Sequence, residues 1–186
     1  MTEVEIDKSK TSESTNTQGK ECVVGRFITE EEGWKIVDVA ATWEGTAYKL
    51  LGSLSVKGVQ GDCSGTTNKI YTEAGFPYPY QSTKTFAAYV QKSHRFRKIN
   101  TASQKLQAGD ILFWDQTHMA IYAPFPEGHS KRDTGVIKRG EKKFNNMYTA
   151  FNDRTNKPYG PFNIETFRGD VCEVFRYLKI SNSPEC

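Results

Sequence analysis

A cysteine with small neighbours is the first residue of this chain that could do chemistry. Cys63 lies within Gly-Asp-Cys-Ser-Gly at 61–65, at the predicted start of a helix that ends at Gly75. The amides of a helix N-terminus carry about half a positive charge, which stabilises a thiolate and predicts a lowered cysteine pKa. The same amides can donate to the oxyanion of an acyl-transfer intermediate. The pattern fits a nucleophile, and it also fits a buried structural cysteine.

His118 is the histidine best placed to act as a base for this thiol. It begins a predicted strand at 118–122, directly after a turn. A histidine at the end of a strand can reach a thiol that is held at the terminus of a packed helix. The alternative is a core or surface histidine, and for His94 and His129 a solvated loop position is the preferred interpretation.

The other cysteines do not indicate a metal site. The chain contains four cysteines in 186 residues, with no C-x-x-C and no H-E-x-x-H pattern, so no metal and no cofactor are predicted. The cysteine content is far below that of a disulfide scaffold. One or two bridges among Cys22, Cys172 and Cys186 stay open.

The elements that must position Cys63 and His118 follow a simple order, with helices first and strands later. A capping box at 29–32 starts a predicted helix over 30–43, a second helix covers 63–75, and Ser82 caps a short third helix. This order predicts an α+β fold in which N-terminal helices pack on an antiparallel sheet. The predicted strands are 111–114, 118–122, 147–151 and 173–179.

Composition sets the domain organisation and excludes several functions. Residues 1–25, rich in Ser, Thr and charge, are predicted to be a flexible leader, and 26–182 a single domain. With 37% hydrophobic and 12% aromatic residues the chain is not wholly disordered, and it has no apolar run long enough to span a membrane. A net charge of +3 is too small for a dedicated nucleic-acid binder, and the basic segment 131–143 is predicted to be a solvated loop.

Four blocks of sequence, taken in order, resemble the NlpC-type cell-wall hydrolases, a papain-like branch of the cysteine peptidases. The resemblance implies a papain-like catalytic domain with Cys63 as nucleophile and His118 as base. It also implies that Tyr48, Asp62 and Ser64 line a site for the peptide stem of peptidoglycan. The four blocks are WEGTAY at 43–48, DCSG at 62–65, LQAGDILFW at 106–114 and HMAIY at 118–122.

Two residues of this implied site have alternative roles or assignments. Asp62 can accept from a substrate amine, or it can cap the helix that begins at Cys63. The family often places a third polar residue, commonly His, on the strand after the histidine strand, and Thr149 occupies that position here. Asn152 is better suited by chemistry, because its amide oxygen accepts from an imidazole N–H. Asn152 is therefore the predicted orienting residue and Thr149 the alternative.

The predicted function is a cysteine amidase or endopeptidase that cleaves peptide bonds in the peptidoglycan stem or cross-link. An acyltransferase on the same Cys–His scaffold and a catalytically inactive cell-wall binding module are the alternatives. The N-terminus shows no standard signal peptide. The chain therefore also resembles amidase effectors that are made in the cytoplasm and injected by type VI secretion into the periplasm of a target cell. That resemblance implies a cognate immunity protein.

Overall fold

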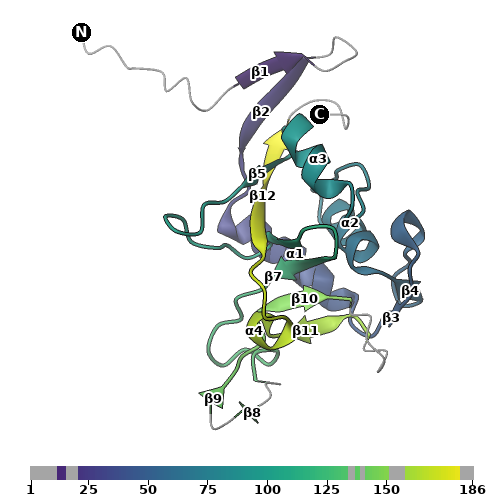
Figure 1. Cartoon of the computed structure of the whole chain (residues 1–186), viewed down its shortest axis with the longest axis vertical. Helices are drawn as coiled ribbons and strands as arrows, with labels where there is room; N and C mark the ends of the chain where they lie inside the picture. The colour runs from purple at the N-terminus through teal and green to yellow at the C-terminus, as the bar shows by residue number, and fades with distance from the viewer. Residues whose placement is uncertain (1–11, 16–20, 134–136, 139–140, 151–157, 181–186) are drawn as a thin grey trace.

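The computed structural model describes residues 12–15, 21–133, 137–138, 141–150 and 158–180, and it shows helices packed on a mainly antiparallel sheet (Figure 1). The described helical elements are α1 (Glu30–Thr42), the 3-10 turn η1 (Gly52–Leu54), α2 (Cys63–Glu73), α3 (Phe86–Lys92) and α4 (Ile164–Phe167). The described strands are β1 (Ser12–Thr15), β2 (Glu21–Phe27), β3 (Ala47–Tyr48), β4 (Gln60–Gly61), β5 (Phe96–Lys98), β6 (Ile111–Trp114), β7 (His118–Tyr122), β8 (Ile137–Lys138), β9 (Glu141–Lys142), β10 (Met147–Thr149), β11 (Gly160–Phe162) and β12 (Glu173–Ile180).

The main sheet has the strand order β1-β2-β12-β6-β7-β10-β11, and β5 also pairs with β12. Its pairs are antiparallel, whereas the short strands β3 and β4 pair in parallel. β6 and β7 form a hairpin in which His118 faces Trp114 across the ladder. The register therefore places the candidate base where β7 leaves the turn.

The helices begin close to where the sequence predicts, and each start has a visible cause. Thr29 and Glu32 form the expected capping box, since the Thr29 hydroxyl accepts from the Glu32 amide and the Glu32 carboxylate accepts from the Thr29 amide. The prediction for α3 was wrong by one turn. The Ser82 carbonyl accepts from the Thr85 and Phe86 amides, so Ser82 closes a turn and the helix begins only at Phe86.

Part of the predicted flexible leader is a strand pair. β1 pairs with β2, and β2 continues onto the edge of β12, where Phe27 faces Leu178 and Val24 faces Ile180. This differs from the expectation because β12 is eight residues long and its edge offers backbone groups that a neighbouring strand can pair with. The β10 strand ends at Thr149, and the last predicted residue of that strand, Phe151, lies outside the described residues.

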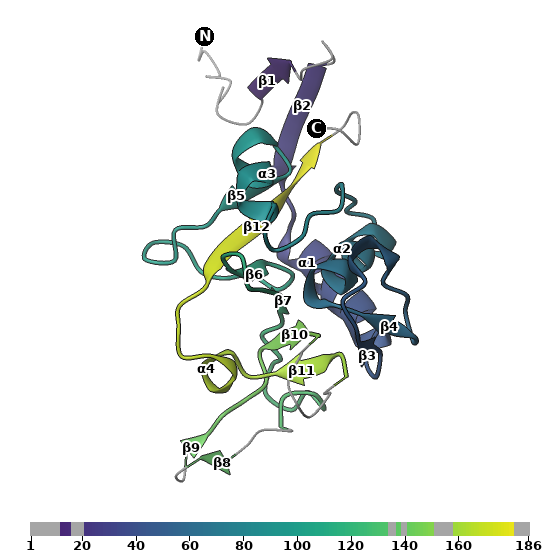
Figure 2. The ribbon, with the colours of Figure 1, turned by 45° about the vertical axis from the view of Figure 1, so that its right-hand side comes forward.

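Two apolar clusters form on the two faces of this sheet. Met119 and Ile121 of β7 lie in the cluster that contains α1 and α2 residues such as Ile36. Ala120 lies in the other cluster, against which Phe167 of α4 packs. Figure 2 shows the same division, with α1 and α2 on one side of the strands and α4 on the other. The alternation of β7 residues between the clusters is the period-two pattern of a strand covered on both faces.

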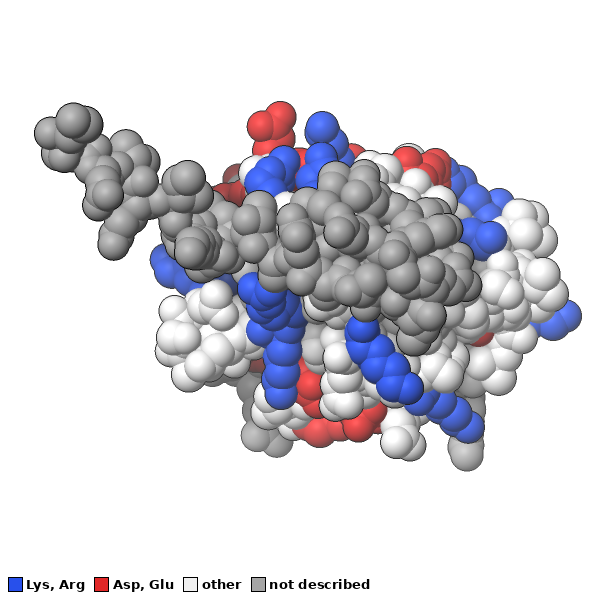
Figure 3. Space-filling view, turned by 90° about the horizontal axis from the view of Figure 1, so that it is seen from above, with Lys and Arg blue, Asp and Glu red and all other residues white. Residues whose placement is uncertain are grey.

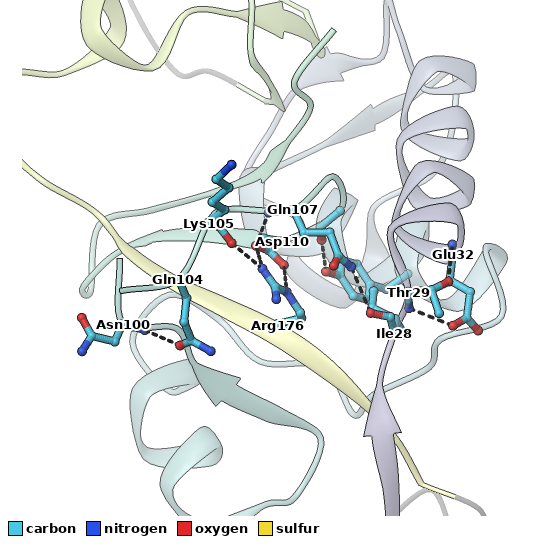
Figure 4. A network of polar contacts seen from close by, with 11 residues as sticks. Ile28, Thr29, Glu32, Asn100, Gln104, Lys105, Gln107, Asp110 and Arg176 are labelled. Atoms are coloured by element: carbon cyan, nitrogen blue, oxygen red, sulfur yellow. Dashed lines mark hydrogen bonds and ion pairs between the residues drawn. The ribbon is translucent and has the colours of Figure 1, made fainter. Parts of the chain in front are cut away.

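A buried ion pair joins β12 to the turn before β6. Asp110 is fully buried, and its two carboxylate oxygens accept from Arg176 Nε at 2.8 Å and from a terminal Arg176 nitrogen at 2.9 Å (Figure 4). The Gln107 amide donates to the same carboxylate at 2.8 Å, and the Gln107 side chain donates to the Ile28 carbonyl. Burial raises the pKa of Asp110, an effect that Arg176 opposes. The guanidinium is therefore needed to keep a charged carboxylate at this depth.

The same turn also receives both N-terminal helices. A Cβ on Gly33 of α1 would lie 1.8 Å from the Ala108 carbonyl oxygen, so only glycine allows this approach. The Tyr71 hydroxyl of α2 donates to the Gly109 carbonyl, and the Gly109 amide donates to Tyr122 of β7. Gly109 itself has a φ of 86°, which favours glycine. Residues 105–110, the Asp110 turn, thus fix α1, α2, β7 and β12 relative to one another.

We predict that Arg176→Ala lowers the free energy of unfolding by about 3 kcal/mol, because the substitution leaves the Asp110 carboxylate buried without its cation. Lys98→Ala is the matched control on the neighbouring strand, since the Lys98–Glu173 pair is 3.5 Å long and exposed and should cost less than about 1 kcal/mol. Urea unfolding at neutral pH measures both. Equal losses in the two variants would show that the buried Asp110–Arg176 pair contributes no more to the free energy of unfolding than the exposed Lys98–Glu173 pair.

Candidate active site

The N-terminus of α2 holds Cys63 against the beginning of β7. Cys63 is the first residue of the helix, and the backbone amides of Met119, Ser64 and Cys63 lower the pKa of its thiol. Met119 follows His118 directly in β7, and α2 packs against this strand. The start of β7 therefore lies near the start of α2, 55 positions earlier in the sequence.

The pKa of Cys63 contradicts the expectation from its helix position. Burial raises this pKa to about 11, and the carboxylate of Asp62 adds to the effect. The amides of Met119, Ser64 and Cys63 act in the opposite direction but do not offset the burial of a side chain that is 9% exposed. The prediction of a lowered pKa was wrong because the helix terminus is not open to water. At neutral pH the Cys63 side chain is therefore a thiol.

His118 is buried between aromatic side chains and fixed by a hydroxyl. Its ring lies 4.7 Å from that of Phe167 and 5.6 Å from that of Trp114. Its Nε2 lies 2.8 Å from Thr149 Oγ1, and this oxygen is also 2.9 Å from the Met119 carbonyl. A threonine hydroxyl has one hydrogen and a carbonyl can only accept, so we assign the proton of this contact to Nε2. That tautomer leaves the lone pair on Nδ1, where a base needs it.

The charge state of His118 is set by burial and by one arginine. Burial lowers the pKa of His118 to about 3, and the positive charge of Arg168 adds to the shift. Arg168 is held in place by Asp170 at 2.7 Å and by the Thr117 hydroxyl at 2.9 Å. The imidazole is therefore neutral at neutral pH. A neutral imidazole can accept a proton, which is what a general base requires.

Asp62 and Ser64 support the helix terminus from the other side. Asp62 is the N-cap of α2, where one carboxylate oxygen accepts from the Gly65 amide and the other from the Gly52 amide, each at 2.8 Å. The capping role considered for Asp62 is therefore present. The Ser64 hydroxyl lies 3.0 Å from the hydroxyl of Tyr80. Asp62 thus connects α2 to the η1 turn, and Ser64 connects it to the segment before α3.

Tyr48 and Tyr80 are two of the three tyrosines, with Tyr78, whose pKa is raised in part by the charge of Cys63, and the sequence pointed only to Tyr48. Burial and the charges of Cys63 and Asp62 raise the pKa of Tyr48 to about 12. The same three causes raise the pKa of Tyr80, which the Ser64 hydrogen bond lowers in part. Both hydroxyls are protonated at neutral pH. Tyr80 lacked a sequence signal because it follows two prolines in an irregular segment. Phe167 ends a four-residue helix that no periodicity reveals, and Arg168 is the C-cap of that helix.

The polar side chain that contacts the His118 ring is that of Thr149, which the sequence offered as the alternative to Asn152. Thr149 reaches the ring nitrogen of His118 on the side of the Met119 carbonyl, as described above. Asn152 lies outside the described residues, so its role stays a prediction. The other two histidines lie elsewhere, with the His129 ring tilted against that of Phe125 and His94 in a groove next to α3.

The remaining expectations concern the other cysteines, a metal site and a membrane-spanning helix. Cys172 is a free thiol, which removes it from the bridges left open, while the side chain of Cys22 and all of Cys186 lie outside the description. Within the described ranges no three His, Cys, Asp or Glu side chains are grouped as metal ligands. Among the same residues, no helix has the length and apolar character needed to cross a membrane.

The described part of the basic segment pairs locally. Lys131 binds Glu44 at 2.7 Å, Lys143 binds Glu165 at 2.6 Å, and Arg132 lies over the ring of Phe144. Figure 3 shows Lys and Arg interspersed with Asp and Glu over the described part of one face. These contacts are typical of a solvated loop with local ion pairs.

Comparison with known proteins identifies the family to which this sequence belongs. The sequence model of the NlpC/P60 family matches residues 43–156, which is more than half of the chain and includes both Cys63 and His118. The chain belongs to the NlpC/P60 family. Members of this family are generally cysteine peptidases or amidases that act on peptidoglycan. No curated protein sequence matches the chain.

A solved structure is similar in fold to this NlpC/P60 chain. It is a lipoprotein-like protein of the NLP/P60 family from Staphylococcus aureus, with a TM-score of 0.50 and 21% sequence identity. The match covers 81% of this chain and 42% of the staphylococcal one, so the present chain spans less than half of that protein. Together with the helices and antiparallel sheet described above, the likeness confirms the predicted α+β NlpC-type fold.

We predict that acid destabilises the protein through His118. The unfolded imidazole binds a proton near pH 6.5 and the folded one only near pH 3, so the stability that the neutral ring contributes is present above pH 6.5 and is lost as the pH falls toward 3. The loss should reach about 5 kcal/mol below pH 3, with about 3 kcal/mol of it between pH 7 and pH 4. His118→Gln should show a flatter fall over this window, whereas His94→Gln should follow the wild type. Urea unfolding between pH 7 and pH 4 measures the slopes, and parallel curves for His118→Gln and wild type would contradict the prediction.

Proposed function

We propose that this chain is a cysteine-dependent amidase or endopeptidase that hydrolyses peptide bonds in the stem or cross-link of peptidoglycan. The observation that supports it best is that Cys63 begins α2 and that its thiol pKa is lowered by the backbone amide of Met119, the residue next to His118 in β7. Membership of the NlpC/P60 family supplies the substrate class. The residues proposed to bind the peptide are Tyr48, Asp62 and Ser64.

The proposed reaction begins from the neutral pair. His118 Nδ1 removes the proton from Cys63 as the sulfur attacks the carbonyl carbon of the scissile amide. The resulting oxyanion accepts hydrogen bonds from amides at the α2 terminus, where the N–H groups of Cys63 and Ser64 converge. The imidazolium then donates its proton to the leaving nitrogen, which breaks the C–N bond and leaves a thioester. Water, deprotonated by His118, hydrolyses the thioester and restores the thiol.

Thr149 is proposed to orient the base during these steps. It accepts from Nε2 of His118 and donates to the Met119 carbonyl, so the ring is held with Nδ1 as its basic nitrogen. The imidazolium that forms in the first step keeps its Nε2 proton, and the hydrogen bond to Thr149 strengthens when the donor is charged. Asn152 stays the other predicted orienting residue.

Delivery and partners are proposals that rest on the resemblance of the sequence alone. Injection into the periplasm of a target cell by type VI secretion, with an immunity protein that covers the site, is one such proposal.

Acyl transfer to an acceptor other than water uses the same Cys63 thioester, and it differs from hydrolysis in the mass of the product. Product analysis therefore separates the two reactions on the same scaffold.

We expect wild-type protein to release peptide fragments from purified peptidoglycan, and Cys63→Ala and His118→Ala to release none. Both changes remove a reacting group, and the rate should fall by at least about a thousandfold. His94→Ala and His129→Ala are matched controls, because both side chains lie away from Cys63. Mass spectrometry of the soluble products identifies the bond that is cut. Digestion by Cys63→Ala, or loss of activity in a control but not in His118→Ala, would refute the assignment.

We predict that Thr149→Val reduces kcat about tenfold to a hundredfold while KM changes little, since valine keeps the shape and removes the acceptor for Nε2. Thr149→Ser restores the hydroxyl and should recover most of the activity. The kcat and KM values of both variants on the same peptide measure the difference. If Thr149→Ser is as slow as Thr149→Val, the hydroxyl does not orient His118.

A further inference from the structure

Tyr80 closes one side of the space around the α2 terminus. Its hydroxyl lies 3.0 Å from Ser64 Oγ, in the residue that follows the nucleophile. Its ring packs against Gly52, where an added Cβ would lie 2.8 Å from the hydroxyl oxygen and 3.2 Å from Cζ of the ring. The ring therefore bridges the η1 turn and the first turn of α2. Both of these elements also bind Asp62, through the Gly52 and Gly65 amides.

The segment that presents Tyr80 is anchored along its length. Phe76 and Tyr78 are buried, and the Tyr78 carbonyl accepts from the Asn68 side chain at 2.9 Å. The Pro77 carbonyl accepts from the Tyr177 hydroxyl at 2.7 Å. Pro77 and Pro79 also restrict the backbone on either side of Tyr78. An aromatic ring at the end of such a segment is a fixed wall.

The position of the hydroxyl agrees with this wall lying beside the nucleophile. Burial comes first among the causes that raise the pKa of Tyr80, and the charges of Asp62 and Cys63 add to it. The 3.0 Å contact with Ser64 Oγ places this hydroxyl at the side chain of the residue that follows Cys63. Because its pKa is raised, Tyr80 stays protonated at neutral pH, and its side chain carries no charge.

We propose that Tyr80, whose side chain is held between Gly52 and Ser64, limits the size of the acyl group that Cys63 can accept, so that this group carries a small side chain next to the attacked carbonyl. The inference rests on the proposed function, since an acyl group reaches Cys63 only if the thiol is the nucleophile. A branched or aromatic side chain at that position is then excluded by the Tyr80 ring.

Alkylation of Cys63 by maleimides of two sizes tests the wall without using peptidoglycan. N-methylmaleimide and N-phenylmaleimide share a reactive group, and mass spectrometry of the Cys63 peptide gives the rate for each. Tyr80→Ala should raise the phenyl-to-methyl rate ratio at least fivefold, and Tyr80→Phe should leave it unchanged because the ring remains. Tyr80→Trp should lower the ratio, which gives a second test if the alanine variant does not fold. Tyr122→Ala, the loss of another half-buried ring, is the control and should leave the ratio unchanged.

Turnover of two peptides that differ only in the residue on the acyl side, alanine or leucine, supplies the second arm. Tyr80→Ala should reduce the preference in kcat/KM for the alanine peptide at least fivefold, and Tyr80→Phe should retain it. If wild-type protein cleaves neither peptide, the proposed function fails, while the maleimide ratios still decide the role of the ring. An unchanged ratio in Tyr80→Ala, an equal gain for both maleimides, or a phenylalanine variant that behaves like alanine would overturn the proposal.

Discussion

The buried ion pair between Asp110 and Arg176 is the constraint on which the rest of this structure depends. A carboxylate at this depth must be held by a cation and by hydrogen bonds, so the turn that carries it cannot move relative to β12. The same turn receives Gly33 of α1 and the hydroxyl of Tyr71 of α2. Asp110 therefore contributes to the site without entering it, because the turn seats the C-terminal half of α2, whose other end carries Cys63.

Burial, and not the helix dipole, decides the charge state of the site. A thiolate and an imidazolium would each lose their hydration at this depth, and the sulfur is compensated by only a few amides. The neutral pair avoids that loss in the resting protein. In the proposed reaction, charge develops only during attack, when the α2 amides would face the oxyanion and Thr149 the imidazolium. An environment of fixed dipoles of this kind favours the transition state over the ground state.

The parts of the fold that sequence could predict are those with local causes. The capping box at Thr29, the cap at Asp62 and the β6–β7 hairpin each depend on neighbours within a few residues. The parts that could not be predicted depend on distant contacts. The η1 turn meets Tyr80 only in the folded chain, and Phe167 reaches His118 from a short helix 49 residues later. β2 was missed because its partner, β12, lies at the far end of the sequence.

The candidate site also depends on contacts between distant segments, and one residue of β7, Met119, takes part in several of them. The Met119 amide lowers the pKa of Cys63, and the Met119 carbonyl accepts from Thr149, whose hydroxyl also contacts the ring of His118. The backbone of a single strand residue therefore faces both the thiol of Cys63 and the hydroxyl of Thr149. Chemistry alone favoured Asn152 as the orienting residue, because a longer side chain with an amide oxygen is a strong acceptor. A hydroxyl suffices at Thr149 because β7 and β10 are neighbouring strands, paired at Tyr148 and Ile121, and a short side chain already spans the gap. Strand register, which no local pattern encodes, thus brings Thr149 to the ring of His118, while the role of Asn152 stays a prediction.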